Sequence, residues 1–211
     1  RVEEVGEHLE KLNSKKIGVD AERISLSDYR TLQEKAGENK FDELKGTITE
    51  LRKIKDEEEI KLQARAAKIT DRALRKTIES TQAGETEKEV ASRLEEFLKK
   101  EGAENVAFGP TVASGVKSSR PHAKAGNKKL SEGELLLIDV GAKIEGYSSD
   151  MTRTFCLGEP TPKQRKVYRA VLKAQKKALK ALEPGKKASD LDQIARDLIK
   201  EAGYGENFGH G

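Results

Sequence analysis

The chain has few of the residues that most readily identify a class of protein. Its 211 residues include one cysteine and no tryptophan, and aromatic residues make up only 4% of the total. Cys156 has no partner, so no internal disulfide can form. No apolar run approaches the roughly 20 residues that cross a bilayer as a helix, and no stretch has the pattern of a signal peptide. The sequence therefore predicts a cytoplasmic protein without a membrane partner.

An excess of charge of one sign is also absent. The chain has 41 lysines and arginines against 37 aspartates and glutamates, which gives a net charge of +4. The basic residues are scattered along predicted helices, whereas a nucleic-acid surface would gather them on one face with aromatic residues between them. We therefore expect no nucleic-acid partner. The apolar residues fall in clear periods, which argues against disorder despite the charged fraction of 37%.

The sequence does contain helices with clear start and stop signals. Thr86 and Glu89 form a capping box, and the helix that they begin is predicted to end at Gly102. Thr161 and Gln164 repeat the box at the start of another helix. The first of these helices has an apolar stripe at helical spacing, so we expect it to cover another layer of structure. The stripe consists of Val90, Leu94, Phe97 and Leu98.

The remaining segments alternate between helical and extended patterns. The segment 41–80 is strongly helical in propensity, with a break expected at Gly46 or within 53–58. Helices are also predicted over 25–37 and 189–203, and extended stretches over 15–20, 105–115, 134–141 and 147–157. This pattern is typical of an α+β fold in which helices cover an antiparallel sheet.

Two aspartates stand where a buried hairpin would normally carry apolar residues. In "LLLIDVGAKIEGYSSDMTRTF", residues 135–155, Asp139 ends an apolar run and Asp150 lies in the next extended stretch. A two-residue turn at 144–145 would place the two aspartates directly opposite each other. A turn at 145–146 would place Asp150 opposite the glycine two residues after Asp139, on the same face. Either turn brings both carboxylates within reach of one ligand.

Two like charges on a largely buried sheet repel each other and are poorly solvated. Either one carboxyl takes up a proton or a cation lies between them. Hard divalent cations such as manganese suit oxygen ligands. The spacing therefore points to a metal site at Asp139 and Asp150, with exposed strand-end aspartates as the alternative. Thr152 shares the face of Asp150 and could donate a hydrogen bond to a ligand carboxylate; the alternative is an ordinary strand threonine.

The hairpin also resembles a known sequence pattern. Asp-x-Gly followed by Gly-Tyr-x-Ser-Asp-x-Thr-Arg-Thr is similar to the first metal-binding hairpin of the pita-bread metallopeptidases, which include aminopeptidase P, prolidase, methionine aminopeptidase and creatinase. "FGPTVASGVKSSRPHAK" (108–124) resembles the segment that carries their Pro-His pair, and "EAGYGENFGHG" (201–211) the start of their histidine-bearing segment. "LRKIKDEEEI" (51–60) resembles the entry helix of the proline-directed and creatinase-like branches.

The resemblance implies a pita-bread fold and a particular domain organisation. Residues 1–45 are expected to be the end of a smaller amino-terminal domain, and residues 46–211 the first half of the catalytic domain. The chain is thus expected to be truncated at both ends, with two glutamate ligands of the five-ligand metal site lying beyond Gly211. Aligned without a gap, His210 matches the histidine that lines the substrate pocket. A four-residue gap would make His210 a metal ligand instead.

The implied activity is a metal-dependent exopeptidase that hydrolyses amino-terminal Xaa-Pro bonds. By resemblance, Asp139 binds one of two divalent metal ions and Asp150 bridges both, and the ions activate a water molecule. Manganese or cobalt is expected, with zinc as an alternative. His122 is expected to bind substrate beside the metals and to act in catalysis. The expected partners are a peptide substrate and a second copy of the chain in a homodimer.

Other readings of the chain remain open. It could be a non-catalytic relative that binds peptides or proteins, or a methionine aminopeptidase-like or creatinase-like hydrolase, and aminopeptidase and dipeptidase are not separated. From its own surroundings, His122 reads as a loop-end histidine after Pro121. Arg120 stands where the family usually has an apolar residue, which affects the expected substrate preference. Cys156 reads as a packed thiol.

Overall fold

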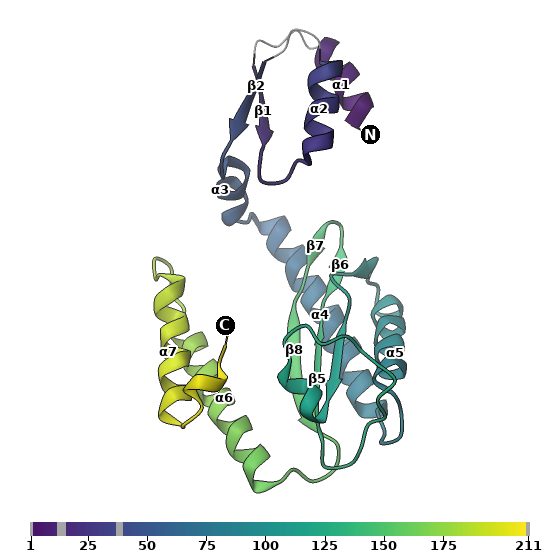
Figure 1. Ribbon diagram of the computed structural model, residues 1–211, viewed down its shortest axis with the longest axis vertical. Coiled ribbons are helices and arrows are strands. Elements are labelled where there is room, and N and C mark those ends of the chain that lie inside the picture. The colour runs from purple at the N-terminus through teal and green to yellow at the C-terminus, as the bar shows by residue number, and fades with distance from the viewer. Residues whose placement is uncertain (1, 12–15, 37–39, 210–211) are drawn as a thin grey trace. The chain divides into compact units, whose positions relative to one another are not determined.

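The computed structural model describes residues 2–11, 16–36 and 40–209, and the chain folds as two compact units, Arg1–Ile60 and Lys61–Gly211 (Figure 1). The boundary predicted from the sequence, between residues 45 and 46, stays a prediction. Among the described residues, no helix is long and apolar enough to cross a membrane. The predicted helix end at Gly37 lies outside the described residues.

The first unit is built on a pair of parallel strands joined by a helix. The strands are in register from Lys16 opposite Lys40 to Asp20 opposite Leu44. Parallel neighbours need a crossover connection, and a helix between them supplies it. Its elements are α1 (Val2–Lys11), β1 (Lys16–Asp20), α2 (Leu26–Lys35), β2 (Lys40–Leu44) and α3 (Thr47–Lys53).

Strand β2 corrects the helix predicted from residue 41. Residues 40–44 pair with β1, and the ring of Phe41 meets that of Tyr29 on α2 edge-to-face, with centroids 5.8 Å apart. Pairing with β1 and this ring contact outweigh the intrinsic helical preference of the segment. The break expected at Gly46 is confirmed, because Gly46 has a left-handed φ of 69° and precedes α3. A second break follows α3, within the predicted region 53–58.

The second unit contains antiparallel strands in two three-stranded sheets. One sheet has the order β3 (Asn105–Val106), β6 (Ala142–Ile144), β7 (Tyr147–Ser148). The other has the order β4 (Thr111–Ser114), β5 (Leu135–Val140), β8 (Met151–Cys156). Strands β5 and β6 form one arm of a long hairpin, and β7 and β8 form the other.

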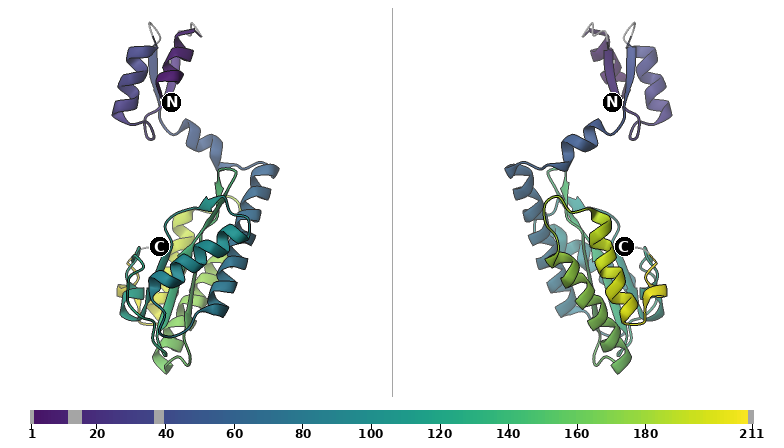
Figure 2. Two further views of the ribbon diagram at one scale, coloured as in Figure 1. Left: turned by 90° about the vertical axis from the view of Figure 1, so that its right-hand side faces the viewer. Right: turned by 90° about the vertical axis from the view of Figure 1, so that its left-hand side faces the viewer.

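The core of this unit lies between the strands of these two sheets and two helices, α4 (Glu57–Ser80) and α5 (Glu87–Lys100). Figure 2 shows both helices. Burial alternates along β5, so that every second residue faces the core. The capping box predicted at the start of α5 is confirmed, and so is its apolar stripe. The largest core side chains are Ile69 from α4, Val90, Leu94 and Leu98 from α5, and Val112, Leu136, Ile138, Val140 and Ile144 from the strands.

Two further helices, α6 (Pro162–Lys180) and α7 (Ala188–Glu201), pack against each other. The predicted capping box of α6 is present, and the side chain of its Gln164 also donates a hydrogen bond of 2.8 Å to the carbonyl of Gly133. The short helices η1 (Gly115–Ser119) and η2 (Gly205–Asn207) complete the described elements.

Gly141 joins β5 to β6 at a point where the two hairpin arms come very close. A Cβ atom on this residue would lie 1.9 Å from the carbonyl oxygen of Ser149 and 2.9 Å from the side chain of Ala107. The first distance is far below any van der Waals contact, and the atom involved is backbone. The hairpin therefore requires glycine at this position.

We predict that Gly141→Ala lowers the free energy of unfolding by about 3 kcal/mol or more, because the backbone must separate to admit a methyl group. Urea denaturation followed by circular dichroism measures the change. Gly109→Ala is the matched control: no atom lies within 4 Å of the Cβ that it would add, so its effect should stay within about 0.5 kcal/mol. Equal denaturation midpoints for the two variants would contradict the prediction.

Candidate metal centre

The register of the hairpin decides how the two aspartates face each other. Ile144 is opposite Tyr147, so the turn lies at residues 145–146, the second of the two predicted alternatives. Both turn residues have positive φ, 46° and 84°, as a tight hairpin turn requires. Asp139 is opposite Thr152, and the same register continued towards the turn aligns Asp150 with the glycine two residues after Asp139. The two aspartates therefore lie on one face, diagonally across the strands.

The two carboxyl groups interact directly. Asp150 is exposed as a residue, but partial desolvation of its carboxyl raises its pKa above the ordinary value, and the negative charge of Asp139 and a hydrogen bond between the two side chains raise it further. Protonation of the Asp150 carboxyl is favoured because two neighbouring carboxylates repel each other. A cation placed between them would relieve the same repulsion. The prediction that the spacing brings these side chains together is confirmed, while metal binding itself stays a prediction.

Thr152 holds one of the carboxylates in place. Its hydroxyl donates a hydrogen bond of 2.7 Å to Oδ1 of Asp139, directly across the strand pair. This is the contact expected of a threonine that orients a ligand carboxylate. Its neighbours on the same face, Thr154 opposite Leu137 and Cys156 opposite Leu135, make no such contact.

A further contact that no sequence pattern predicts supports the hairpin. Thr70, fully buried on α4, hydrogen-bonds through its hydroxyl to that of Ser149 at 2.8 Å and accepts the backbone N–H of Ala142 at 3.0 Å. These bonds hold the two arms at the point where regular strand pairing is interrupted, next to Asp150. Thr70 lies mid-helix and 72 residues before Ala142, so no local pattern indicated the contact.

His122 follows the strand that borders Asp139. Thr111 of β4 is opposite Asp139, and β4 continues through η1 into the segment that carries His122. His122 is exposed and has a positive φ of 57°, which is uncommon outside glycine. Its catalytic and substrate-binding roles stay predictions, and so do the roles of His210, which lies outside the described residues.

Cys156 has the properties of a packed thiol. It is half-buried, and burial raises the pKa of its thiol, with a smaller contribution from the nearby charge of Glu159. A raised pKa keeps the group protonated and unreactive at neutral pH. It borders a cavity of about 280 Å³ between β8 and α6.

The donor set fits a hard divalent cation but is incomplete among the residues that the structure describes. Asp139 and Asp150 offer carboxylate oxygens from one face, which is the ligand type that manganese prefers. Across residues 2–11, 16–36 and 40–209, however, no group of three or more His, Cys, Asp or Glu side chains is arranged to hold a metal ion. Two carboxylates alone leave most coordination positions of such an ion to other ligands.

Comparison with known proteins places this arrangement in a family. The sequence profile of Metallopeptidase family M24 matches residues 61–211, and that of the Creatinase/Prolidase N-terminal domain matches residues 1–54. The chain belongs to metallopeptidase family M24. It is 41% identical over 198 residues to a Xaa-Pro dipeptidase of Pyrococcus furiosus, a match that covers 94% of this chain and 57% of the relative.

Solved structures of an X-Pro aminopeptidase and a Xaa-Pro dipeptidase are similar to almost the whole chain. An X-Pro aminopeptidase from Thermotoga maritima aligns with a TM-score of 0.89 and 40% identity, covering 97% of this chain and 58% of that one. A Xaa-Pro dipeptidase from Bacillus anthracis aligns with a TM-score of 0.91 and 36% identity, covering 99% and 59%. The predicted α+β, pita-bread fold is confirmed. The chain spans somewhat more than half the length of these relatives.

We predict that Asp150→Asn stabilises the metal-free chain at pH 7. Because the pKa of Asp150 is raised in the fold, ionisation of this group costs stability as pH rises through that pKa. The variant removes the cost, and the gain should stay within about 1 kcal/mol because the side chain is exposed. Thermal unfolding in a chelator, from pH 4 to pH 8, measures it.

The matched control is Asp197→Asn, which removes one negative charge from the exposed surface of α7. It should lack the gain that grows with pH. A wild-type chain that is more stable than Asp150→Asn at pH 7 in chelator would contradict the prediction, since the two carboxylates would then not repel each other.

Proposed function

We propose that this chain forms part of a metal-dependent exopeptidase that hydrolyses amino-terminal Xaa-Pro bonds. The observation that carries the proposal is the pair of carboxylates, Asp139 and Asp150, held on one face of a hairpin in a chain that belongs to family M24. Relatives named as Xaa-Pro dipeptidases in two Pyrococcus species, each 41% identical, support the substrate class.

Each residue has a defined part in the proposed reaction. Asp139 and Asp150 would hold two divalent ions, and Thr152 would keep the Asp139 carboxylate oriented through its hydrogen bond. Bound ions supply a water molecule of lowered pKa and polarise the scissile carbonyl. His122 would donate a hydrogen bond to the substrate where negative charge develops. His210 would line the pocket that receives the peptide.

The finer attributes of the proposal are the metal, the assembly and the compartment. We propose manganese or cobalt, with zinc as the alternative, because carboxylate ligands favour hard divalent ions. The single cysteine is in keeping with a cytoplasmic protein. The homodimer is proposed from the resemblance to the family. Residues 1–45 and 46–211 remain the proposed limits of the amino-terminal and catalytic domains.

A non-catalytic, peptide-binding relative is the alternative of a different class. A protein without catalytic activity would have no need for two carboxylates that repel each other. The retention of Asp139, Asp150 and the Thr152 hydrogen bond together favours the enzyme.

The test is a peptidase assay on the complete gene product that contains these residues. Ala-Pro, Ala-Pro-Ala and Met-Ala-Ser are compared side by side, with manganese, with cobalt, and with chelator. We expect metal-dependent cleavage of the proline peptides. We also expect Asp150→Asn to lose nearly all turnover, because it removes a carboxylate proposed to hold the two metal ions. Faster cleavage of Met-Ala-Ser, or full turnover by Asp150→Asn, would overturn the proposal.

A second prediction concerns the hydroxyl of Thr152. We expect Thr152→Val to weaken manganese affinity about 10- to 100-fold, the usual effect of removing the partner that orients a ligand. Isothermal titration of the same gene product gives the dissociation constants. Thr154→Val is the matched control, since Thr154 lies two residues along the same strand face and makes no bond to either aspartate. Equal affinities for the two variants would show that the hydrogen bond does not serve the metal.

A further inference from the structure

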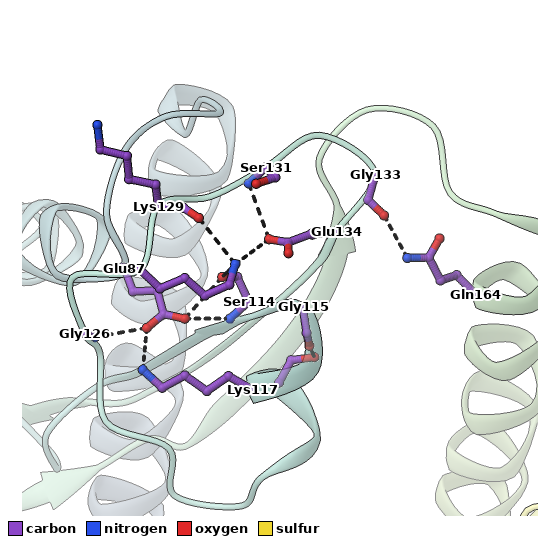
Figure 3. Close-up of polar contacts among 12 residues, drawn as sticks. Glu87, Ser114, Gly115, Lys117, Gly126, Lys129, Ser131, Gly133, Glu134 and Gln164 are labelled. Atoms are coloured by element: carbon purple, nitrogen blue, oxygen red, sulfur yellow. Dashed lines mark hydrogen bonds and ion pairs between the residues drawn. The ribbon is translucent and has the colours of Figure 1, made fainter.

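A buried glutamate lies at the start of α5, apart from the metal centre. Glu87 is fully buried, and four donors surround its carboxylate (Figure 3). Oε1 accepts the backbone N–H of Ser114 at 2.9 Å and the hydroxyl of the same residue at 3.2 Å. Oε2 accepts the ammonium of Lys117 at 2.5 Å and the backbone N–H of Gly126 at 3.0 Å. A buried carboxylate is tolerated only with such partners.

These donors come from both ends of one segment. We call residues 115–126 the His122 loop. Ser114 directly precedes it, Lys117 lies within its first turn and Gly126 ends it, so one carboxylate binds its entry, its body and its exit. The chain after the loop is held by the same region, because the backbone N–H of Lys88 donates to the carbonyl of Gly126 and that of Glu87 to the carbonyl of Lys128.

A second ion pair extends the contacts to β5. The ammonium of Lys128 donates to the hydroxyl of Ser114 at 2.8 Å and to Oε2 of Glu134 at 2.6 Å. Glu134 immediately precedes β5, the strand that carries Asp139. The cations Lys117 and Lys128 and the anions Glu87 and Glu134 thus alternate around Ser114. They link the base of the His122 loop to the residue that precedes β5, the strand of the metal centre.

The loop contains a conformation that requires support. His122 has a φ of 57°, a left-handed value that is costly for a residue with a Cβ. Such a conformation persists only when neighbouring contacts determine it. Within the loop, Ala123 is buried and Ala125 packs against the core. The bonds to Glu87 add polar contacts on both sides of His122.

The charge state of Glu87 agrees with this role. Burial raises the pKa of its carboxyl, but the hydrogen bonds from Lys117, Ser114 and Gly126 outweigh burial, so the pKa lies below its ordinary value. The group is therefore ionised at neutral pH and presents a full negative charge to Lys117.

We propose that Glu87 is a positioning residue that, paired with Lys117, fixes the His122 loop and so determines where His122 is held beside the substrate. The functional meaning of that placement rests on the proposed peptidase function. The structural part, that the Glu87 carboxylate orders residues 115–126, can be tested without metal or peptide.

The test compares Glu87→Gln and Lys117→Met with the wild type, each in the complete gene product that contains these residues, in chelator at pH 7. Hydrogen–deuterium exchange reports on loop amides, and the ring resonances of His122, assigned with a His122→Asn variant, report on its surroundings. In both variants we expect at least tenfold faster exchange within 115–126 and a His122 resonance shifted towards that of an unstructured histidine. The resonance of His8, on α1 in the other unit, should not move.

Two matched controls separate positioning from general stability. Glu101→Gln removes a comparable carboxylate at the opposite end of α5, where it binds Lys76 and Arg72, and should leave loop exchange and the His122 resonance unchanged. Lys117→Arg keeps the positive charge and should retain the wild-type signals. Should Glu87→Gln fail to fold, Lys117→Met decides the matter, because Lys117 is partly exposed.

Wild-type loop exchange and an unshifted His122 resonance in both folded variants would overturn the proposal, as would a loss of protection spread evenly over the second unit. Loss of peptidase activity is no part of this readout. A gene product that shows the expected loop changes but cleaves no Xaa-Pro peptide would sink the proposed function and leave the positioning role of Glu87 supported.

Discussion

The antiparallel register of the hairpin from Leu135 to Cys156 is the constraint on which the candidate site depends. Side chains alternate between the two faces of a strand, so a shift of one residue between the two strands would place Asp139 and Asp150 on opposite faces of the sheet. The turn at 145–146 sets the pairing, and the contacts of Thr70 hold the arms where pairing is interrupted. The mutual position of Asp139 and Asp150 is thus a result of backbone geometry, fixed before any ligand arrives.

Much of this geometry could be predicted from the sequence because its signals are local. The capping boxes at Thr86 and Thr161 specify helix starts through contacts within four residues, and both are present. The two-residue period of side chains along a strand predicts that both aspartates and Thr152 share one face for either of the two possible turns. The family resemblance rested on the same local pattern, and the profile match over residues 61–211 agrees with it.

What the sequence could not show depends on contacts between distant residues. Residues 41–44 have helical propensity, yet they form β2 because β1, some 24 residues earlier in the register, offers a strand to pair with. Thr70 binds Ser149, 79 residues away, and Glu87 binds Ser114, 27 residues away. No periodicity or local motif indicates contacts at such separations. From the sequence, Glu87 is predicted only to lie in the first turn of a capped helix, where acidic residues are common.

The close approach at Gly141 has a consequence for how the hairpin motif should be read in other sequences. The Ser149 carbonyl excludes any side chain at that position, whatever the protein does. A relative that lost its catalytic role would still need this glycine to build the same hairpin, whereas nothing in the backbone requires the two aspartates. Within one short motif, the glycine indicates the backbone shape of the hairpin, whereas the aspartates indicate its chemistry. A sequence search that gives these positions equal weight will therefore find inactive homologues together with enzymes.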